Sequence, residues 1–156
     1  MSGRFGAGTA GIAERRRSMA RTQGPVAVLG IGAMGHGMAI SALRAGIPTI
    51  VWNRTPQATR DLAELGAEVA PTAVDAARRA AIVVTMVTDA DAVISIARDE
   101  GMLGALAPAA IWVQMSTIGV RGIERVVALV ERESVLTSRS STRRCREART
   151  PPSTAS

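Results

Sequence analysis

Two short stretches of the sequence carry glycines at a spacing that could bind a phosphate group. Residues 6–11 read GAGTAG and residues 30–35 read GIGAMG, so both fit the pattern G-x-G-x-x-G. Between a strand and a helix, the first glycine of this pattern permits a sharp turn, the second lets the backbone approach a pyrophosphate, and the third allows close helix–strand packing. The pattern therefore predicts a dinucleotide site where a strand precedes it and a helix follows it.

The flanking residues select the second stretch. GIGAMG follows residues 25–29, PVAVL, a short apolar run typical of a buried parallel strand. A predicted helix follows it to about residue 45. GAGTAG follows MSGRF and precedes an arginine-rich segment, so neither neighbour is of the required kind. We therefore interpret GAGTAG as a chance match and expect the cofactor to bind GIGAMG through Gly30, Ile31, Gly32, Ala33, Met34 and Gly35.

The residues after the next predicted strand indicate which dinucleotide binds. NAD-binding proteins usually carry Asp or Glu there, which accepts a hydrogen bond from the ribose 2′-hydroxyl. Here the sequence reads Asn53-Arg54-Thr55, with no carboxylate. The guanidinium fork of Arg54 suits a phosphate, and Asn53 and Thr55 add hydrogen-bonding groups. The sequence therefore predicts NADP, with NADPH preferred over NADH.

The elements that must position these residues alternate between strand and helix. The helix after GIGAMG is expected to bury Met38, Ala42 and Ala45 and to end at Gly46. Further strands are predicted at residues 49–52, 68–70, 81–87 and 111–115, and further helices at 56–66, 73–80, 89–98 and 120–130, with Thr72 as an N-cap. This alternation predicts an α/β fold, a Rossmann-like parallel sheet with right-handed crossovers.

Charge defines the ends of the predicted domain. The formal net charge of the 156 residues is +6, and arginines concentrate in residues 4–21 and 139–149. We predict a disordered basic arm at 1–23, an NAD(P)-binding domain at 24–132, and a disordered Arg/Ser-rich tail at 133–156. No aromatic residues alternate with these arginines, so nucleic-acid binding is the less favoured interpretation.

Other sequence features exclude several classes of protein. No apolar run approaches the ~20 residues of a membrane helix, and the N-terminus has no apolar signal-peptide region. A single cysteine, Cys145, suits a reducing, cytoplasmic compartment and is assigned no chemistry. His36, the sole histidine, is interpreted as a surface or capping residue. No metal site and no catalytic residue are predicted.

Four short motifs occur in order along the chain: VLGIGAMG at residues 28–35, VWNRT at 51–55, VTMVTD at 84–89 and STI at 116–118. Together they resemble the β-hydroxyacid dehydrogenases, the family of 3-hydroxyisobutyrate dehydrogenase, tartronate semialdehyde reductase and the N-terminal domain of 6-phosphogluconate dehydrogenase. The resemblance covers residues 25–130. It implies hydride transfer between NADP and a small β-hydroxyacid. Imine reductases share the first two motifs and are the alternative.

The resemblance also implies further site residues. Met86, Val87 and Thr88 correspond to a family loop along the adenine-ribose side of the cofactor. Ser116 and Thr117 correspond to a pair beside the nicotinamide and the substrate carboxylate, so both are expected to bind substrate and Thr117 also the cofactor. Two residues depart from the family pattern: Gln114 replaces Asp, and Val120 replaces Pro.

The family continues with a sixth strand, a long helix whose lysine acts as acid or base, and an all-helical second domain. This sequence contains no lysine, and the residues after Glu131 resemble none of these parts. We therefore expect a truncated cofactor domain that is catalytically incomplete, with a reading-frame shift near Glu131 as one hypothesis. A stand-alone NADP-binding module is an alternative. The last strand, at Ile111, Trp112 and Val113, is expected to form an exposed edge that promotes self-association.

Overall fold

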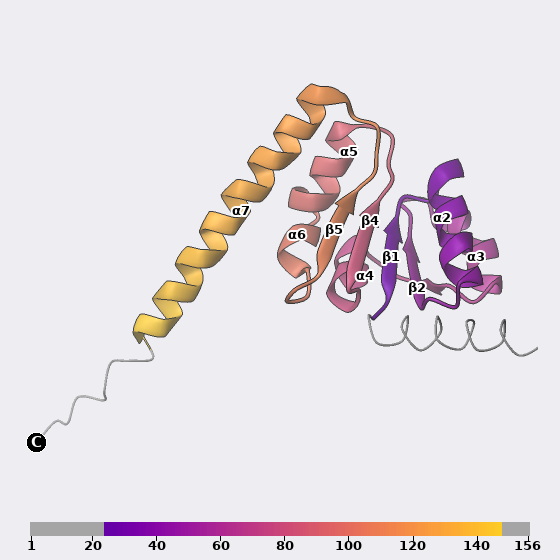
Figure 1. The fold of residues 1–156 in the computed structure, drawn as a ribbon, viewed down its shortest axis with the longest axis horizontal. Helices are drawn as coiled ribbons and strands as arrows, with labels where there is room; N and C mark the ends of the chain where they lie inside the picture. The colour runs from indigo at the N-terminus through magenta and orange to yellow at the C-terminus, as the bar shows by residue number, and fades with distance from the viewer. Residues whose placement is uncertain (1–23, 148–156) are drawn as a thin grey trace, which may run out of the picture.

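The computed structural model describes residues 24–147, with the side chains of residues 24–134. Its centre is a parallel sheet of five strands in the order β3-β2-β1-β4-β5 (Figure 1). The strands are β1 (Val26–Leu29), β2 (Thr49–Trp52), β3 (Glu68–Val69), β4 (Ile82–Thr85) and β5 (Ile111–Gln114). The predicted α/β, Rossmann-like fold is confirmed.

Helices cover both faces of the sheet, so the domain has three layers (Figure 1). One face carries α2 (Ala33–Arg44), the 3-10 turn η1 (Pro56–Thr59) and α3 (Arg60–Glu64). The other face carries α4 (Ala73–Arg79), α5 (Ala90–Ile94) with its π-helical continuation η2 (Ser95–Asp99), α6 (Met102–Ala105) and α7 (Gly119–Glu147). No helix in the described range is long and apolar enough to cross a membrane.

Two apolar cores hold these layers together, because successive residues of a strand point to opposite faces. On β1, Ala27 and Leu29 belong to the core beneath α4 to α7, whereas Val28 belongs to the core beneath α2 and α3. β1 and β2 are largely buried on both sides, which explains their continuous apolar sequences.

The rotation of α2 differs from the prediction. The buried residues of this helix are Gly35 and Ala39, while Ala45 is exposed and Met38 is only partly buried. The glycine-rich turn sets this rotation, because the first turn of α2 packs directly against it. A Cβ on Gly35 would lie only 2.0 Å from the carbonyl oxygen of Gly30, so Gly35 must face the turn. The predicted apolar stripe was therefore wrong.

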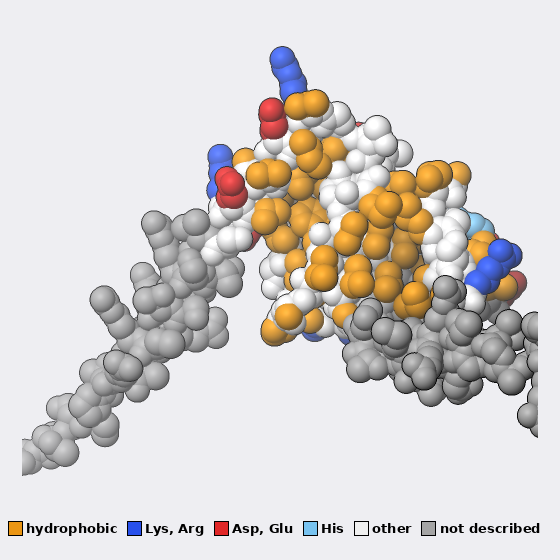
Figure 2. Space-filling view, in the orientation of Figure 1, with side chains coloured by type: hydrophobic (Ala, Val, Ile, Leu, Met, Phe, Trp, Pro, Cys, Tyr) orange, Lys and Arg blue, Asp and Glu red, His pale blue; other side chains and the backbone are white. Residues whose placement is uncertain are grey.

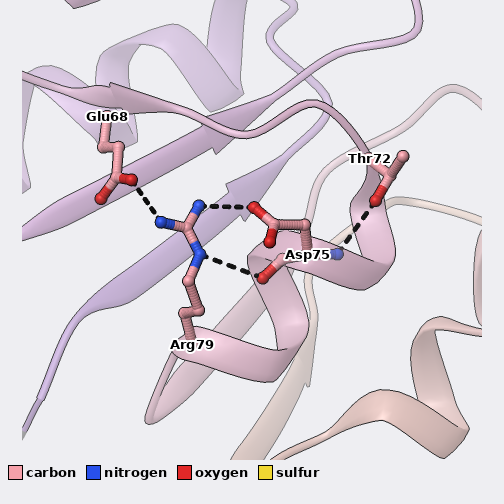
Figure 3. Close-up of polar contacts among 4 residues, drawn as sticks. All are labelled: Glu68, Thr72, Asp75 and Arg79. Atoms are coloured by element: carbon pink, nitrogen blue, oxygen red, sulfur yellow. Dashed lines mark hydrogen bonds and ion pairs between the residues drawn. The ribbon is translucent and has the colours of Figure 1, made fainter.

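The predicted ends of α2 and α4 are confirmed. Gly46 follows α2 with φ +74° and donates its N–H to Leu43 O at 2.9 Å, as expected of a C-cap glycine. Thr72 Oγ1 accepts the N–H of Asp75 at 3.0 Å and caps α4. Figure 3 shows this cap and the Arg79 guanidinium, which binds Asp75 at 2.6 Å and also Glu68 of β3. These exposed pairs connect α4 to the short edge strand β3.

The last helix is longer than predicted. α7 was expected to end near Val130, but the backbone is helical to Glu147. No glycine or proline occurs between Gly122 and Pro151, and the Glu and Arg residues of this segment favour a helix. Residues 133–147 of the predicted disordered tail are therefore helical, while the predicted arm at 1–23 lies outside the described residues. The short helix α6 was not predicted, since four residues give no periodic pattern.

One part of the sheet surface is not covered by any helix of residues 24–147. On this face, Ile111 and Val113 of β5 lie beside Ile82 and Val84 of β4. Met115, the residue after β5, continues the same row. Ile111 is 58% exposed and Met115 is 46% exposed. Figure 2 shows the hydrophobic side chains gathered over β1, β4 and β5 on this face. We call these five residues the open sheet face.

Candidate functional site

A cavity of about 800 Å³ lies where the carboxyl ends of β1, β2 and β4 meet. In the strand order β3-β2-β1-β4-β5, β2 and β3 lie on one side of β1, and β4 and β5 lie on the other side. This is a topological switch point, where open α/β sheets bind their ligands. The lining comes from the turn after β1, the end of β2, the loop after β4, and α5 with η2.

The fold itself requires two glycines of the turn. Gly30 has φ +99°, and a Cβ there would lie 2.4 Å from Met86 O and 2.7 Å from Val87 Cγ1. Gly35 leaves no room for a Cβ against Gly30 O. These two glycines bring the turn and α2 against the loop after β4.

Gly32 is different, because no contact with a described residue requires it to be glycine. Its φ is −88°, which any residue adopts, and a Cβ built on it would meet no atom within 4 Å. It lines the cavity as the N-cap of the twelve-residue α2, whose first turn contains no acidic residue. Free backbone N–H groups and the helix dipole favour an anion at this position. The residues present therefore fit a dinucleotide whose pyrophosphate approaches the backbone at Gly32.

Asn53 fixes the end of β2 to the glycine-rich turn. Its Oδ1 accepts the N–H of Ile31 at 2.9 Å, and its Nδ2 donates to Thr55 O at 3.0 Å. Much of the hydrogen-bonding capacity predicted for a ligand is thus used within the protein, leaving one amide hydrogen. Asn53 thereby holds the residues that follow β2 against the glycine-rich turn, and both segments line the cavity.

Arg54 lies exposed on the cavity wall and makes no hydrogen bond or ion pair with any described residue. Asp89 also lines the cavity and caps α5, accepting the N–H of Ala92 at 2.8 Å. This hydrogen bond lowers the pKa of the Asp89 carboxyl below its ordinary value, and the positive charge of Arg54 adds a smaller effect. The guanidinium is available to an anionic ligand near this acidic neighbour.

The sequence did not identify the part of the lining that comes from α5. Besides the predicted residues, the cavity is lined by Trp52, Asp89, Asp91, Ala92, Ser95 and Ile96. The predicted helix at 89–98 directly follows a central strand, so its first turns had to start at the same edge of the sheet. Ala92, Ser95 and Ile96 are also spaced at i, i+3 and i+4, which places them on one helix face. That combination could have identified them.

The cavity brings together most of the predicted cofactor residues. Its lining includes Gly30, Ile31, Gly32, Ala33, Met34, Gly35, Asn53, Arg54, Thr55, Met86, Val87 and Thr88. Their contact with a cofactor stays a prediction.

Ser116 and Thr117 are not in the lining. The hydroxyl of Ser116 is buried and accepts the N–H of Val87 at 2.8 Å, while Thr117 is exposed. α7 begins at Gly119, so neither residue directly precedes its first helical residue. Their contact with a substrate also stays a prediction.

His36 lies outside the lining and pairs with a carboxylate that the sequence did not identify. Its Nε2 is hydrogen-bonded to Asp61, which joins α2 to α3 on the surface. This hydrogen bond is the main cause that lowers the pKa of Asp61. Among the described residues, no group of histidine, cysteine and acidic side chains could hold a metal ion.

The parallel sheet, the switch-point cavity and the glycine-rich turn with an anion-ready helix define a dinucleotide-binding domain of the Rossmann class. Comparison with known families is more specific: residues 25–137 match the NAD binding domain of 6-phosphogluconate dehydrogenase. The chain belongs to this family.

Individual relatives agree with this assignment. An uncharacterized oxidoreductase of Bacillus subtilis, YfjR, is 42% identical over 104 residues, which are 66% of this chain and 36% of the relative. The 3-hydroxyisobutyrate dehydrogenase of Mycobacterium tuberculosis, solved with L-serine, matches with a TM-score of 0.65 and 31% identity, over 70% of this chain and 37% of that one.

The structure of an imine reductase from Myxococcus stipitatus with NADP+ also matches, with a TM-score of 0.63 and 30% identity. It covers 69% of this chain and 37% of that one. A V8 variant of this enzyme was solved with NAD+. The chain thus spans about a third of the length of these relatives.

Proposed function

We propose that the cavity binds NADP, with the pyrophosphate at the N-terminus of α2 and the adenosine ribose at the end of β2. The observation that carries the proposal is Gly32, a cavity-lining glycine that neither the backbone geometry nor the packing requires. A glycine at this position gives a phosphate access to the backbone N–H groups. Membership of an NAD-binding family supports the same assignment.

The preference for NADP over NAD rests on Arg54. Its guanidinium is exposed on the cavity wall and has no ion-pair partner within the described part of the chain. The NADP 2′-phosphate offers such a partner, whereas the 2′-hydroxyl of NAD does not. The carboxylate of Asp89, which also lines the cavity, repels a phosphate, so a preference for NADP requires the 2′-phosphate to lie closer to Arg54 than to Asp89. Related solved proteins hold NADP+ or NAD+, so the preference is a property to be measured.

The reaction we propose for the whole enzyme is hydride transfer between NADP and a small β-hydroxyacid. Bound NADP supplies or accepts the hydride, and the residues of this chain bind and orient the dinucleotide. The acid or base on the substrate oxygen must come from elsewhere, because the sequence contains no lysine. The match to 3-hydroxyisobutyrate dehydrogenase favours this substrate class. The match to an imine reductase supports imine reduction as the second candidate.

Calorimetric titration with NADPH and with NADH tests the cofactor assignment. NADPH is expected to bind more tightly than NADH. Absence of binding by either compound would contradict the proposed site, and tighter binding of NADH would contradict the role of Arg54.

We also propose that isolated copies of the chain associate through β5 and the open sheet face. β5 is an edge strand of the sheet, the exposed Ile111 lies in it, and the exposed Met115 follows it directly. An edge strand with free backbone groups and apolar neighbours favours pairing with another strand.

A further inference from the structure

Ser116 lies outside the cavity, yet its hydroxyl is bonded to one of the cavity walls. Its Oγ accepts the N–H of Val87 at 2.8 Å and donates to Thr85 O at 3.5 Å. The residue is only 7% exposed, so water cannot readily replace it as a partner. The contact with Thr85 O is long for an O–H···O hydrogen bond, so the bond from Val87 is the stronger of the two.

The side chain of Gln114 is hydrogen-bonded to both the backbone N–H and the backbone carbonyl of Ser116. The Nε2 of Gln114 donates to Ser116 O at 3.0 Å, and its Oε1 accepts the N–H of Ser116. A carboxylate at position 114 could accept but could not donate. The carboxamide is thus suited to fixing the backbone at Ser116.

The wall that Ser116 holds is the one in contact with the glycine-rich turn. Gly30 approaches Met86 O and Val87 Cγ1 so closely that a Cβ at Gly30 would overlap both. The loop is fixed by the N–H of Met86, which donates to Leu29 O at 2.9 Å, and by the N–H of Val87, which donates to Ser116. Loss of the second bond would free the loop beyond Met86.

We propose that Ser116, held by Gln114, is a positioning residue that sets the cavity wall formed by Met86, Val87 and Thr88. The proposal rests on the proposed function insofar as this wall contacts NADP. It gives Ser116 a role distinct from substrate contact, because the residue acts through Val87.

The first test needs no cofactor. Amide hydrogen exchange at Val87, followed by NMR, is expected to be at least about tenfold faster in Ser116→Ala than in the wild type. Ser41→Ala is the matched control, because Ser41 is an exposed serine of α2 whose hydroxyl donates to Gly37 O at 2.8 Å. An unchanged exchange rate at Val87 in Ser116→Ala would overturn the proposal.

The second test compares two ligands. The Kd for NADPH is expected to rise about tenfold in Ser116→Ala and in Gln114→Leu. The Kd for adenosine 2′,5′-bisphosphate should rise by a similar factor, because Met86, Val87 and Thr88 correspond to the loop along the adenine-ribose side of the cofactor. A Kd for NADPH within about twofold of the wild type in Ser116→Ala would overturn the positioning role, and so would an equal loss of affinity in the control Ser41→Ala. A wild-type chain that binds neither compound contradicts the proposed function, while the exchange rate at Val87 still decides whether Ser116 holds the wall.

Discussion

Substitution of Gly32 by valine separates ligand binding from folding. A Cβ at Gly32 meets no protein atom within 4 Å, and the backbone φ of −88° suits valine. The expected loss of stability is therefore limited to the poorer N-cap, about 1 kcal/mol, or roughly 4–8 °C in Tm. The valine would fill the space that the proposed pyrophosphate needs. Loss of two charge-assisted hydrogen bonds at ~1.5–3 kcal/mol each weakens binding at least about a hundredfold.

Gly37→Val is the matched control in the same helix. Gly37 is also exposed and without a neighbour within 4 Å of its Cβ position, but it does not line the cavity. Valine favours a helix more than glycine does, so stability should be kept or raised and affinity unchanged. Gly30→Ala is the opposite control, because overlap with Met86 O and φ of +99° should destabilise the fold itself.

The assay is calorimetric titration of each variant with NADPH, together with thermal unfolding of the free protein. If Gly32→Val bound NADPH within about threefold of the wild type, the space above Gly32 would not hold the pyrophosphate. Equal losses in Gly32→Val and Gly37→Val would place the effect in the helix rather than in the turn. Gly8→Val, in the first glycine-rich stretch and outside the described residues, is expected to leave the affinity unchanged.

Further predictions concern specificity, pH dependence, association and activity. Arg54→Ala should weaken NADPH binding about tenfold or more, from the loss of ~1.5–3 kcal/mol, with little effect on NADH; equal losses in titrations with both cofactors would refute the assignment. The hydrogen bond from the N–H of Ala92 lowers the pKa of the Asp89 carboxyl below its ordinary value of 3.8. The Asp89 carboxylate therefore stabilises the fold above pH 3.8, and this stabilisation is lost as the pH falls through the lowered pKa. Asp89→Ala should therefore unfold in less urea than the wild type at pH 7, and the two midpoints should converge on acidification; a gap that widened in acid would contradict this. Ile111→Glu should reduce self-association measured by sedimentation, because it places a charge on the edge strand β5. An unchanged degree of association would show that β5 is not the interface. The 156-residue chain should bind NADPH without reducing methylmalonate semialdehyde, tartronate semialdehyde or a cyclic imine, since it has no lysine to act on the substrate oxygen; turnover of ~1–10³ s⁻¹ would show that another group serves.

The sequence alone determined the fold and the centre of the site. Strands that are buried on both faces of a parallel sheet appear in the sequence as short, continuous apolar runs. Such runs alternate here with segments of helical periodicity, so the order of strands and helices could be predicted from local composition. The glycine spacing at Gly30, Gly32 and Gly35, after one such run, located the turn. The segments at residues 53–55 and 86–88 each follow a predicted strand, and parallel strands place their carboxyl ends at one edge of the sheet.

Only the tertiary structure decided how individual side chains are used. Long-range partners join residues far apart in the sequence: Ser116 reaches Val87, Asn53 reaches Ile31, and His36 reaches Asp61. Such pairs leave no local pattern, so the sequence did not indicate the bond between Ser116 and Val87 and left His36 without a partner. The rotation of α2 was decided by contact between Gly35 and Gly30, which hydrophobic periodicity does not record. Gly30, Gly32 and Gly35 are equivalent in the motif, but packing requires only the first and third, and this leaves the second free for a ligand.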